Sequence, residues 1–526
     1  VRANGFGSPP QPILQALTGN IQNMDAIVGT DVDGKPNEPE WPDVDFIVSN
    51  PPFLGGKLLR ANLGDAYVNS MFAVWKGRVA AESDLCCYWF EKARVHIAAG
   101  KCMRAGLLAT QGIRGGANRE VLKRIKESGD IFFAESDRPW VLDGANVHIS
   151  MVGFDDGADK GRVLDGSQAS TINANLTSNV DITQAVPLKE NAGIAFMGDT
   201  KGGAFDLPED EALAMLVAPN PHGKPNSDVL VPWVNGMDIT RRGRGMWILD
   251  FGSGTMEVEA AKYEAPFAKI LRDVKPGRIA SRDLKRDAYW HHTRPRPEMR
   301  AALGQLRRFV ATPTVAKHRL FIWMQAPTLP DHQLIAFARA DDYFFGVLQS
   351  RIHEVWGLKL GTRLETRPRY TPTSCFETYP FPWPLGNENP ETSEALAVAT
   401  AAASLADLRE RWLNPPEWTK EMETRFPATP GGPWDRQIED PAVERPLAVY
   451  RTIEPLDAKA AVALKKRTLT ALYNEMPRWL FDAHRNLDEA VAAAYNDAAG
   501  GVVLTPDAGD EQILEYLLEL NQTRSR

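Results

Sequence analysis

The sequence of 526 residues is long enough for two to four domains, each with a hydrophobic core of its own. No apolar run approaches the roughly 20 residues that a membrane-spanning helix needs, and the first residues lack the charged and apolar regions of a secretory signal, so we expect a cytoplasmic protein with no membrane partner. The cysteines, Cys86, Cys87, Cys102 and Cys375, have no CxxC spacing, which argues against a disulfide framework and against a zinc site.

The formal net charge of −8 is distributed unevenly along the chain. Residues 271–320 contain 13 Lys or Arg residues and 4 Asp or Glu residues, a local excess of +9. Residues 385–526 contain 24 acidic and 15 basic residues, so they hold the whole negative excess. A basic segment of this size indicates contact with a polyanion, and we expect that contact in the middle of the chain.

Residues 1–155 alternate short apolar runs with helical patterns, as is typical of a βαβ array. This pattern predicts most of a parallel sheet with its crossover helices. We expect strands at residues 21–28, 45–49, 105–110, 131–136 and 147–155, and helices at residues 84–100 and 117–129.

From residue 156 the periodicity weakens, and glycine, proline and tryptophan become frequent. Short strand patterns such as "GMWILDFG" and the helical pattern "DDYFFGVLQSRIHEVWGL" predict a mixed α/β domain that ends at the proline-rich "YPFPWP". The rest of the chain carries helical patterns, which predict a helical C-terminal region. The predicted domains are therefore residues 1–155, 156–385 and 386–526.

The stretch "DFIVSNPPF" places two prolines directly after a predicted strand. Proline interrupts both helix and sheet ladder, so residues 50–53 are expected to form a rigid loop at the carboxyl end of the strand, where open α/β sheets bind ligands. Pro51 and Pro52 would hold two acceptors still, the Asn50 side chain and the Pro51 carbonyl. Two fixed acceptors suit the two N–H donors of an exocyclic amino group. Phe53 could stack on a base, which is worth about 1–3 kcal/mol per base.

Accepting both hydrogens of an aromatic amine favours its pyramidal form, whose lone pair is free to attack a methyl donor. A base in a duplex presents its amino group in this way only after it is flipped out of the stack. The loop therefore predicts methyl transfer to an amino group of a flipped base.

This motif resembles the catalytic motif of amino-group DNA methyltransferases that use S-adenosylmethionine, most often the adenine-N6 type. The stretches "NPPFLGGK", "IRGGANR", "SDRPWVLDGANVHISMVGFDDG" and "YTPTSCFETYPFPWP" also resemble the MmeI-like group of methyltransferases from restriction-modification and phage-defence systems. The motif order is similar to the gamma arrangement. The resemblance implies a Rossmann-like S-adenosylmethionine-dependent methyltransferase sheet, followed by a target-recognition domain that binds double-stranded DNA. It also implies cofactor contacts from Asp25 at a strand end and from Asp84 at a helix start.

One feature departs from the family pattern. The glycine-rich cofactor loop and the acidic residue after the second strand precede the position of Asp25 by several tens of residues in the family, whereas 24 residues precede Asp25 here. The first residue is Val1 and not methionine. We therefore expect a fragment without the N-terminal part of the methyltransferase sheet. A nuclease domain of the MmeI-like type would lie upstream of Val1, and partner proteins of a defence system are a further expectation.

The sequence allows two interpretations of several residues. Asp25 and Asp84 are cofactor contacts or, alternatively, a turn residue and a helix N-cap. Gly55, Gly56 and Lys57 form either a mobile loop over the flipped base, with Lys57 on a phosphate, or only a turn.

In the basic segment, phosphate contacts are expected from Arg282, Lys285, Arg286, Arg294 and Arg296. The adjacent histidines of this segment have no acidic partner at ligand spacing, so no metal site is expected.

Two functions follow as hypotheses. The first is a site-specific adenine-N6 DNA methyltransferase, or its catalytic and recognition part. The second is a DNA-binding specificity subunit or remnant without catalysis. Methylation of an amino group in RNA or protein remains a further alternative, because NPP followed by an aromatic residue also occurs in enzymes that modify glutamine side chains or RNA.

Overall fold

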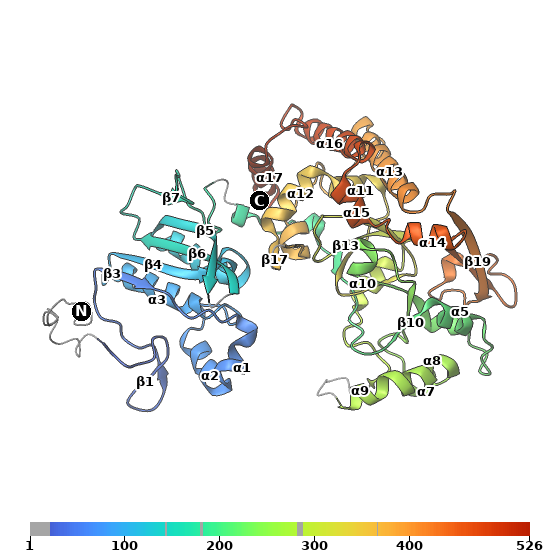
Figure 1. Ribbon diagram of the computed structural model, residues 1–526, viewed down its shortest axis with the longest axis horizontal. Helices are drawn as coiled ribbons and strands as arrows, with labels where there is room; N and C mark the ends of the chain where they lie inside the picture. The colour runs from blue at the N-terminus through green and yellow to red at the C-terminus, as the bar shows by residue number, and fades with distance from the viewer. Residues whose placement is uncertain (1–20, 143–144, 179–181, 281–287, 365–366, 526) are drawn as a thin grey trace, which may run out of the picture. The chain divides into compact units, whose positions relative to one another are not determined.

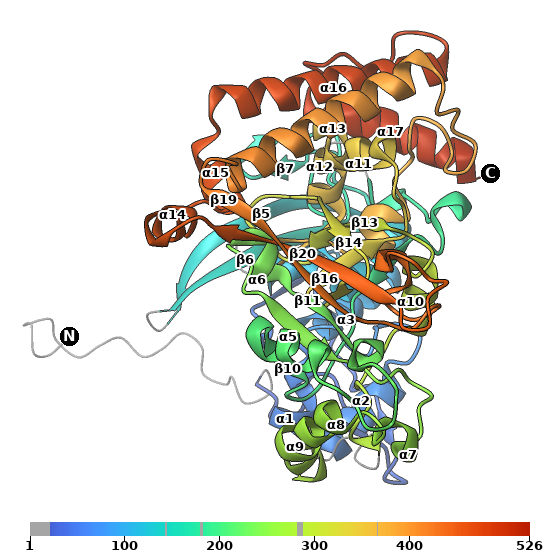
Figure 2. The ribbon, with the colours of Figure 1, turned by 90° about the vertical axis from the view of Figure 1, so that its right-hand side faces the viewer.

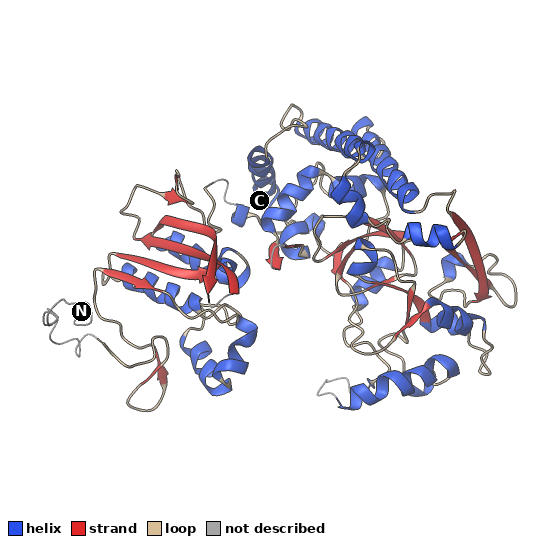
Figure 3. Cartoon of the chain, in the orientation of Figure 1, coloured by secondary structure: helices blue, strands red, loops and turns tan. Residues whose placement is uncertain are grey.

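The computed structural model describes residues 21–142, 145–178, 182–280, 288–364 and 367–525 (Figure 1). The chain divides into two compact units, Val1–Thr183 and Gln184–Arg526. Both units combine helices and strands, as the colours of Figure 3 show. Within the described ranges, no helix is long and apolar enough to cross a membrane.

The first unit is built on a six-stranded sheet with the order β3-β4-β6-β5-β7-β8. Its strands, with the short pair β1-β2, are β1 (Gly29–Thr30), β2 (Pro36–Asn37), β3 (Phe46–Ser49), β4 (Arg104–Thr110), β5 (Asp130–Leu142), β6 (Ala145–Asp155), β7 (Val163–Leu164) and β8 (Ser167–Gln168). Its helices and 3-10 turns are η2 (Gly56–Leu58), α1 (Leu59–Leu63), α2 (Asp65–Val74), α3 (Cys86–Ala98), η3 (Gln111–Arg114), η4 (Gly116–Asn118), α4 (Arg119–Ser128) and, at the unit boundary, η5 (Ile182–Gln184).

The sheet is mixed and not mainly parallel. β3 and β4 pair in parallel, but β6 pairs antiparallel with both β4 and β5. The prediction of a mostly parallel sheet is wrong for β5 and β6, because only two residues separate them along the chain. A parallel crossover needs a dozen or more residues, so a connection this short forces a hairpin.

The segment 21–28 is irregular, and the prediction of a strand there is wrong. Its carbonyl groups accept hydrogen bonds from side chains: the Trp75 indole donates to Ile27 at 2.9 Å, and the Trp41 indole donates to Ala26 at 3.0 Å. Buried backbone groups need partners, and here tryptophan side chains satisfy carbonyls that a strand would pair with a neighbouring strand.

The second unit contains two four-stranded sheets, ordered β10-β12-β11-β15 and β14-β13-β16-β9, and the hairpins β17-β18 and β19-β20. Its strands are β9 (Ala195–Met197), β10 (Asp206–Pro208), β11 (Leu230–Val234), β12 (Met246–Leu249), β13 (Arg308–Pro313), β14 (Ile322–Gln325), β15 (Leu329–Pro330), β16 (Leu334–Phe337), β17 (Thr362–Leu364), β18 (Arg367–Arg369), β19 (Thr419–Pro427) and β20 (Leu447–Pro455).

Helices surround these sheets. The α-helices are α5 (Glu209–Val217), α6 (Gly236–Thr240), α7 (Glu257–Ala260), α8 (Glu264–Lys269), α9 (Lys275–Ala280), α10 (Pro297–Leu303), α11 (Asp342–Gln349), α12 (Arg351–Leu360), α13 (Ser393–Leu413), α14 (Ala458–Leu464), α15 (Leu469–Glu475), α16 (Arg478–Ala499) and α17 (Asp510–Ser525). Shorter helical segments are η6 (Lys189–Asn191), η7 (Asn226–Val229), η8 (Ile270–Val274), η10 (Pro372–Phe376) and η11 (Asp435–Gln437).

The compact units divide the chain differently from the predicted domains, and the three-part division stays a prediction. The first unit extends past residue 155, because β7 pairs with β5 in the same sheet. Residues 386–526 belong to the second unit, where α13 packs against α11 and α16 (Figure 2). This C-terminal region is mainly helical, as expected, but it also contains the hairpin β19-β20, which the sequence did not indicate.

Close packing of α11, α13 and α16 depends on Gly346. A Cβ atom at this position would lie 2.8 Å from Val398 Cγ1 and 2.9 Å from Ala402 Cβ, both on α13. It would also lie 3.2 Å from Leu487 Cδ1 on α16. Only glycine therefore lets the three helices approach this closely.

We predict that Gly346→Ala lowers the melting temperature of the protein, because overpacking a core typically costs about 1–3 kcal/mol. Thermal unfolding followed by circular dichroism measures this change. Gly357→Ala on α12 is the matched control, since its Cβ would lie 3.4 Å from the Tyr370 ring, an ordinary contact. Equal melting temperatures for the two variants would contradict the packing argument.

Candidate functional site

The predicted catalytic loop lies at the carboxyl end of a parallel strand pair. β3 pairs with β4 so that Ser49 is opposite Leu107, and residues 50–55 leave the sheet directly after Ser49. The turns η3 and η4 follow the end of β4 at the same edge. Two neighbouring parallel strands thus deliver their loops to one place, which is where open α/β sheets form ligand sites.

The four motif residues divide into exposed and anchored positions. Asn50 and Pro52 are exposed, Pro51 is buried, and Phe53 is half-buried against the hydrophobic core of the first unit. Among the described residues, none hydrogen-bonds to the Asn50 side chain. The loop is therefore anchored on its buried side, while the Asn50 side-chain amide remains accessible to a ligand.

Asp84 lies directly beneath this loop. Its Oδ1 atom accepts hydrogen bonds from the backbone N–H of Leu54 at 3.1 Å and from that of Cys86 at 3.2 Å. The backbone N–H of Leu85 donates to the Leu54 carbonyl at 3.0 Å. The side chain accepts from the first residue of α3, but the N-cap position itself is Leu85, so the prediction of an N-cap at Asp84 is wrong by one residue. The bond to the loop is a contact that the sequence did not indicate.

Gly56 makes a second close contact between the loop and the chain before α3. A Cβ atom at Gly56 would lie 2.1 Å from the carbonyl oxygen of Glu82, which no side chain tolerates. Lys57 lies in η2, where the chain turns into α1, and its side chain is exposed with no ion pair among the described residues. Residues 55–57 thus form a turn in this structure, and a phosphate contact by Lys57 stays a prediction.

Asp25 is held in a turn at the edge of the first unit. Its Oδ1 atom accepts hydrogen bonds from the backbone N–H groups of Ile27 and Val28, both at 2.9 Å. Its Oδ2 atom accepts a hydrogen bond from the Tyr67 hydroxyl at 2.9 Å. Burial, and then the hydrogen bond to Asp25, raise the pKa of Tyr67. The described contacts connect Asp84 to the predicted catalytic loop, but they connect Asp25 to its own turn and to α2.

Tyr67 and Lys92 are residues of this region that sequence reasoning missed. Lys92 projects from α3 and donates to the carbonyls of Ala26, at 3.1 Å, and Pro39. Burial lowers the pKa of Lys92 to about 8. The available signal was the charged pair Glu91 and Lys92 after an apolar run in a helical pattern, where charged side chains need partners.

Of the predicted phosphate-binding residues, Arg282, Lys285 and Arg286 lie outside the described residues. Arg294 is exposed, and its backbone forms a bridge with Thr200. Its side chain has no hydrogen bond or ion pair among the described residues. Arg296 is half-buried, and its Nε atom donates to the Gly198 carbonyl at 3.3 Å.

Several other cations of the basic segment are already engaged within the protein. Arg300 pairs with Asp199 and Asp250, and Arg308 pairs with Asp342 at 2.9 Å. The local excess of +9 therefore overstates the charge that this segment presents to a ligand.

The two adjacent histidines contact different residues. His291 bonds to the Thr255 carbonyl at 2.8 Å, and His292 bonds to the Leu249 carbonyl at 2.9 Å. The described part of the chain contains no cluster of metal-ligating side chains.

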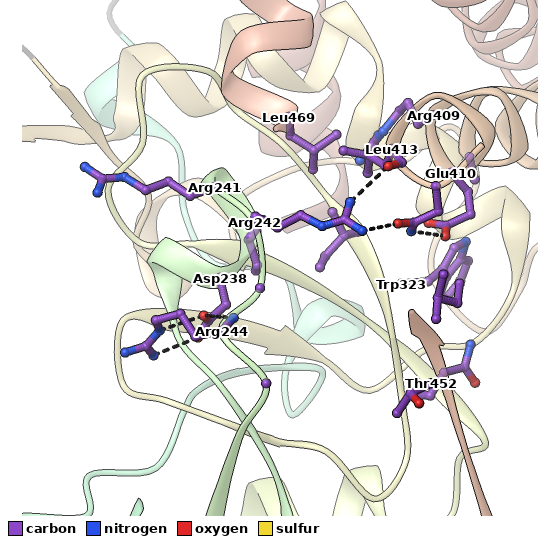
Figure 4. Close-up of a pocket in the computed structure, with 18 of the residues that line it drawn as sticks. Asp238, Arg241, Arg242, Arg244, Trp323, Arg409, Glu410, Leu413, Thr452 and Leu469 are labelled. Carbon is purple, nitrogen blue, oxygen red and sulfur yellow. Dashed lines mark hydrogen bonds and ion pairs between the residues drawn. The ribbon is translucent and has the colours of Figure 1, made fainter. Parts of the chain in front are cut away.

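A cavity of about 1020 Å³ lies in the second unit, between the loop after α6, β14, α13 and β20 (Figure 4). Arg244 forms a two-point ion pair with Asp238 at 2.8 and 2.9 Å. Arg242 points towards α13, where it donates to the Leu413 carbonyl at 2.9 Å and to the Asn414 side chain. Burial lowers the pKa of Arg242. Both arginines bind within the protein: Arg242 joins the loop after α6 to the end of α13, and Arg244 binds Asp238 on α6.

Comparison with known proteins finds a family match for the middle of the chain. Residues 201–383 match the family model described as "MmeI, target recognition domain". The matched residues lie within the second unit. No curated protein sequence matches the chain.

One solved structure shows a related fold. The structure of the Type IIL restriction-modification enzyme MmeI in complex with DNA is 18% identical and superposes with a TM-score of 0.64, covering 91% of this chain and 57% of the MmeI chain. This chain thus spans little more than half the length of MmeI. The DrdV-DNA complex is 11% identical with a TM-score of 0.33, covering 88% of this chain and 57% of that chain. The type IIG restriction endonuclease BpuSI is 10% identical with a TM-score of 0.24, covering 87% and 55%.

We predict that Gly56→Ala destabilises the first unit by about 1–3 kcal/mol, because the added Cβ would collide with the backbone of Glu82. Chemical denaturation followed by tryptophan fluorescence measures the loss. Gly55→Ala is the control, since it has nothing within 4 Å of its Cβ and a φ of −59° that alanine adopts without strain. A tolerated Gly56→Ala change would refute this account of the loop.

Proposed function

We propose that the chain carries the catalytic loop and the target recognition domain of a site-specific DNA methyltransferase. It would transfer the methyl group of S-adenosylmethionine to the N6 amino group of adenine in double-stranded DNA. The observation that supports this proposal most is the loop at the carboxyl end of β3. It exposes the Asn50 amide while buried Pro51 and the Asp84 hydrogen bond hold the backbone beneath it.

The loop provides the groups that an amino-group methylation needs. The Asn50 side-chain oxygen and the Pro51 carbonyl would accept the two hydrogens of the adenine amino group, which frees its lone pair for attack. Phe53 would stack on the face of the flipped base, although it is itself half-buried against the core. S-adenosylmethionine supplies an electrophilic methyl group when it is bound.

The two aspartates fit the cofactor differently. Asp25 is exposed and accepts three hydrogen bonds, so its carboxylate keeps one acceptor position for a donor of the cofactor. Asp84 is 7% exposed and bonds to the loop through Oδ1, so its geometry fits a structural role better than cofactor contact. Of the two aspartates, we therefore assign the cofactor contact to Asp25 and not to Asp84.

DNA recognition is proposed for the second unit because residues 201–383 match the target recognition domain of MmeI, a protein whose structure was solved in complex with DNA. Of the two predicted phosphate-binding arginines that the structure describes, Arg294 fits a phosphate contact better than Arg296, since its side chain is exposed and unpaired among the described residues. Arg307 of the same segment shares this exposure and lack of a described partner. The setting of restriction-modification or phage defence belongs to the same proposal.

A second candidate function is sequence-specific DNA binding without catalysis. One observation favours it: the family match, at residues 201–383, is to a target recognition domain and so supports DNA recognition without testing methyl transfer. The two candidates differ in a single measurable property, methyl transfer by the chain itself.

Asn50→Ala is predicted to reduce methyl transfer by about 100-fold or more, since it removes an acceptor aimed at the reacting amino group. The assay incubates the protein with labelled S-adenosylmethionine and unmethylated DNA of mixed sequence. The DNA is then digested to nucleosides, and the label in N6-methyladenine is measured. DNA affinity should stay unchanged. Asn62→Ala, an exposed amide on α1, is the control. Full activity of the Asn50 variant would contradict the assignment, and an inactive but DNA-binding wild type would favour the second candidate.

Arg294→Ala should weaken binding to all duplex sequences to a similar degree and lower the slope of log K against log salt by about 1, as loss of one phosphate contact does. Fluorescence anisotropy with a labelled duplex at several salt concentrations measures both effects. Arg411→Ala on α13 is the matched control, because Arg411 is also an exposed arginine, paired with Asp407. An unchanged salt slope for the Arg294 variant would remove Arg294 from the interface.

A further inference from the structure

We propose that Asp84 is a positioning residue for the catalytic loop and that Asn118 links it to the loop after β4. The catalytic consequence rests on the proposed function, whereas the positioning itself can be tested without methyl transfer. The observation that points to this role is the pair of hydrogen bonds that joins residues 84 and 85 to Leu54, the residue after Phe53.

Leu54 is held at both of its backbone polar groups. Its N–H donates to Asp84 Oδ1 at 3.1 Å, and its carbonyl accepts from the Leu85 N–H at 3.0 Å. Two bonds on one residue restrict the orientation of both adjoining peptide planes, and the first of these planes begins at Phe53. The hydrogen bonds thus constrain the direction in which the motif leaves the sheet.

Asp84 is in turn held by Asn118. The Asn118 Oδ1 atom accepts a hydrogen bond from the Asp84 backbone N–H at 2.8 Å, and its Nδ2 atom donates to the Gly112 carbonyl at 3.3 Å. Gly112 lies in η3, directly after β4. A continuous chain of hydrogen bonds therefore joins the loop after β4, the start of α3 and the loop after β3.

The role of the Asp84 side chain in this chain of bonds is that of an acceptor. Its Oδ1 atom receives two backbone N–H groups, those of Leu54 and Cys86, and an amide oxygen could receive both in the same geometry. A carboxylate that contacts a bound ligand through its charge would not be replaceable in this way. Asparagine at position 84 therefore separates positioning from a charge-dependent contact.

Asp84→Ala is expected to lower kcat by about 10- to 100-fold, because a displaced reacting group costs up to about 100-fold. The dissociation constant for S-adenosylmethionine, measured by calorimetry, should stay within about 2-fold of the wild-type value. Asp84→Asn should restore kcat to within about 3-fold of wild type. Asp65→Ala, an exposed aspartate on α2, is the control for loss of a carboxylate.

Hydrogen exchange read by mass spectrometry tests the positioning without any activity. Peptides covering residues 50–58 should exchange about 10-fold faster in Asp84→Ala than in wild type, and at the wild-type rate in Asp84→Asn. Asn118→Ala should raise exchange at residues 83–86 and 111–118 while leaving the Asp84 acceptor in place, which provides a milder variant if Asp84→Ala does not fold.

The outcomes separate the two proposals. If wild type transfers no methyl group, the proposed function fails, and the exchange pattern still decides whether Asp84 positions the loop. Unchanged exchange at residues 50–58 in a folded Asp84→Ala variant would overturn the inference. It would also be overturned if Asp84→Asn lost activity and S-adenosylmethionine affinity as fully as Asp84→Ala, because the charge would then be the essential property.

Discussion

The parallel pairing of β3 with β4 is the constraint on which the candidate site depends. It directs two strand ends to one edge of the sheet, so that residues 50–55 and the turns η3 and η4 emerge beside each other. An antiparallel arrangement would send the two loops to opposite edges. The hydrogen bonds through Asp84 and Asn118 can form because this pairing has already brought the loops together.

Rigidity at this edge comes from several weak constraints that act on the same few residues. Prolines 51 and 52 restrict their own backbone, Asp84 and Leu85 hold Leu54, and Gly56 allows the chain to pass the Glu82 carbonyl. None of these contacts uses the Asn50 side chain. The loop is thus ordered by its buried side and leaves its exposed side free for a substrate, which is the arrangement that preorganised acceptors require.

In the second unit, ion pairs within the protein reduce the number of basic side chains that are available to a ligand. Arg300 and Arg308 engage aspartates, and Arg242 and Arg244 join the α6 loop to α13 and to Asp238. Arg294 is exposed and unpaired among the described residues, and it lies among the residues that match the MmeI target recognition domain. Binding by this unit would therefore depend on a few placed cations more than on its overall charge.

The sequence by itself determined the local features whose causes are local. The strand at residues 46–49, the loop that follows it, the helices near residues 84–100 and 117–129, and the helical C-terminal pattern all depend on prolines, helix caps and periodicity within a short window. The resemblance read from the motifs also placed a recognition domain where residues 201–383 match the MmeI model.

Only the tertiary structure decided the features that depend on distant partners. Residues 21–28 are irregular because Trp41 and Trp75 bind their carbonyls, and β6 is antiparallel because it forms a hairpin with β5. Asp84 and Leu54 are hydrogen-bonded although 30 residues separate them in the sequence, and Arg242 and Leu413 are hydrogen-bonded across 171 residues. Such contacts arise from packing between elements, and no periodicity or spacing within either segment encodes them.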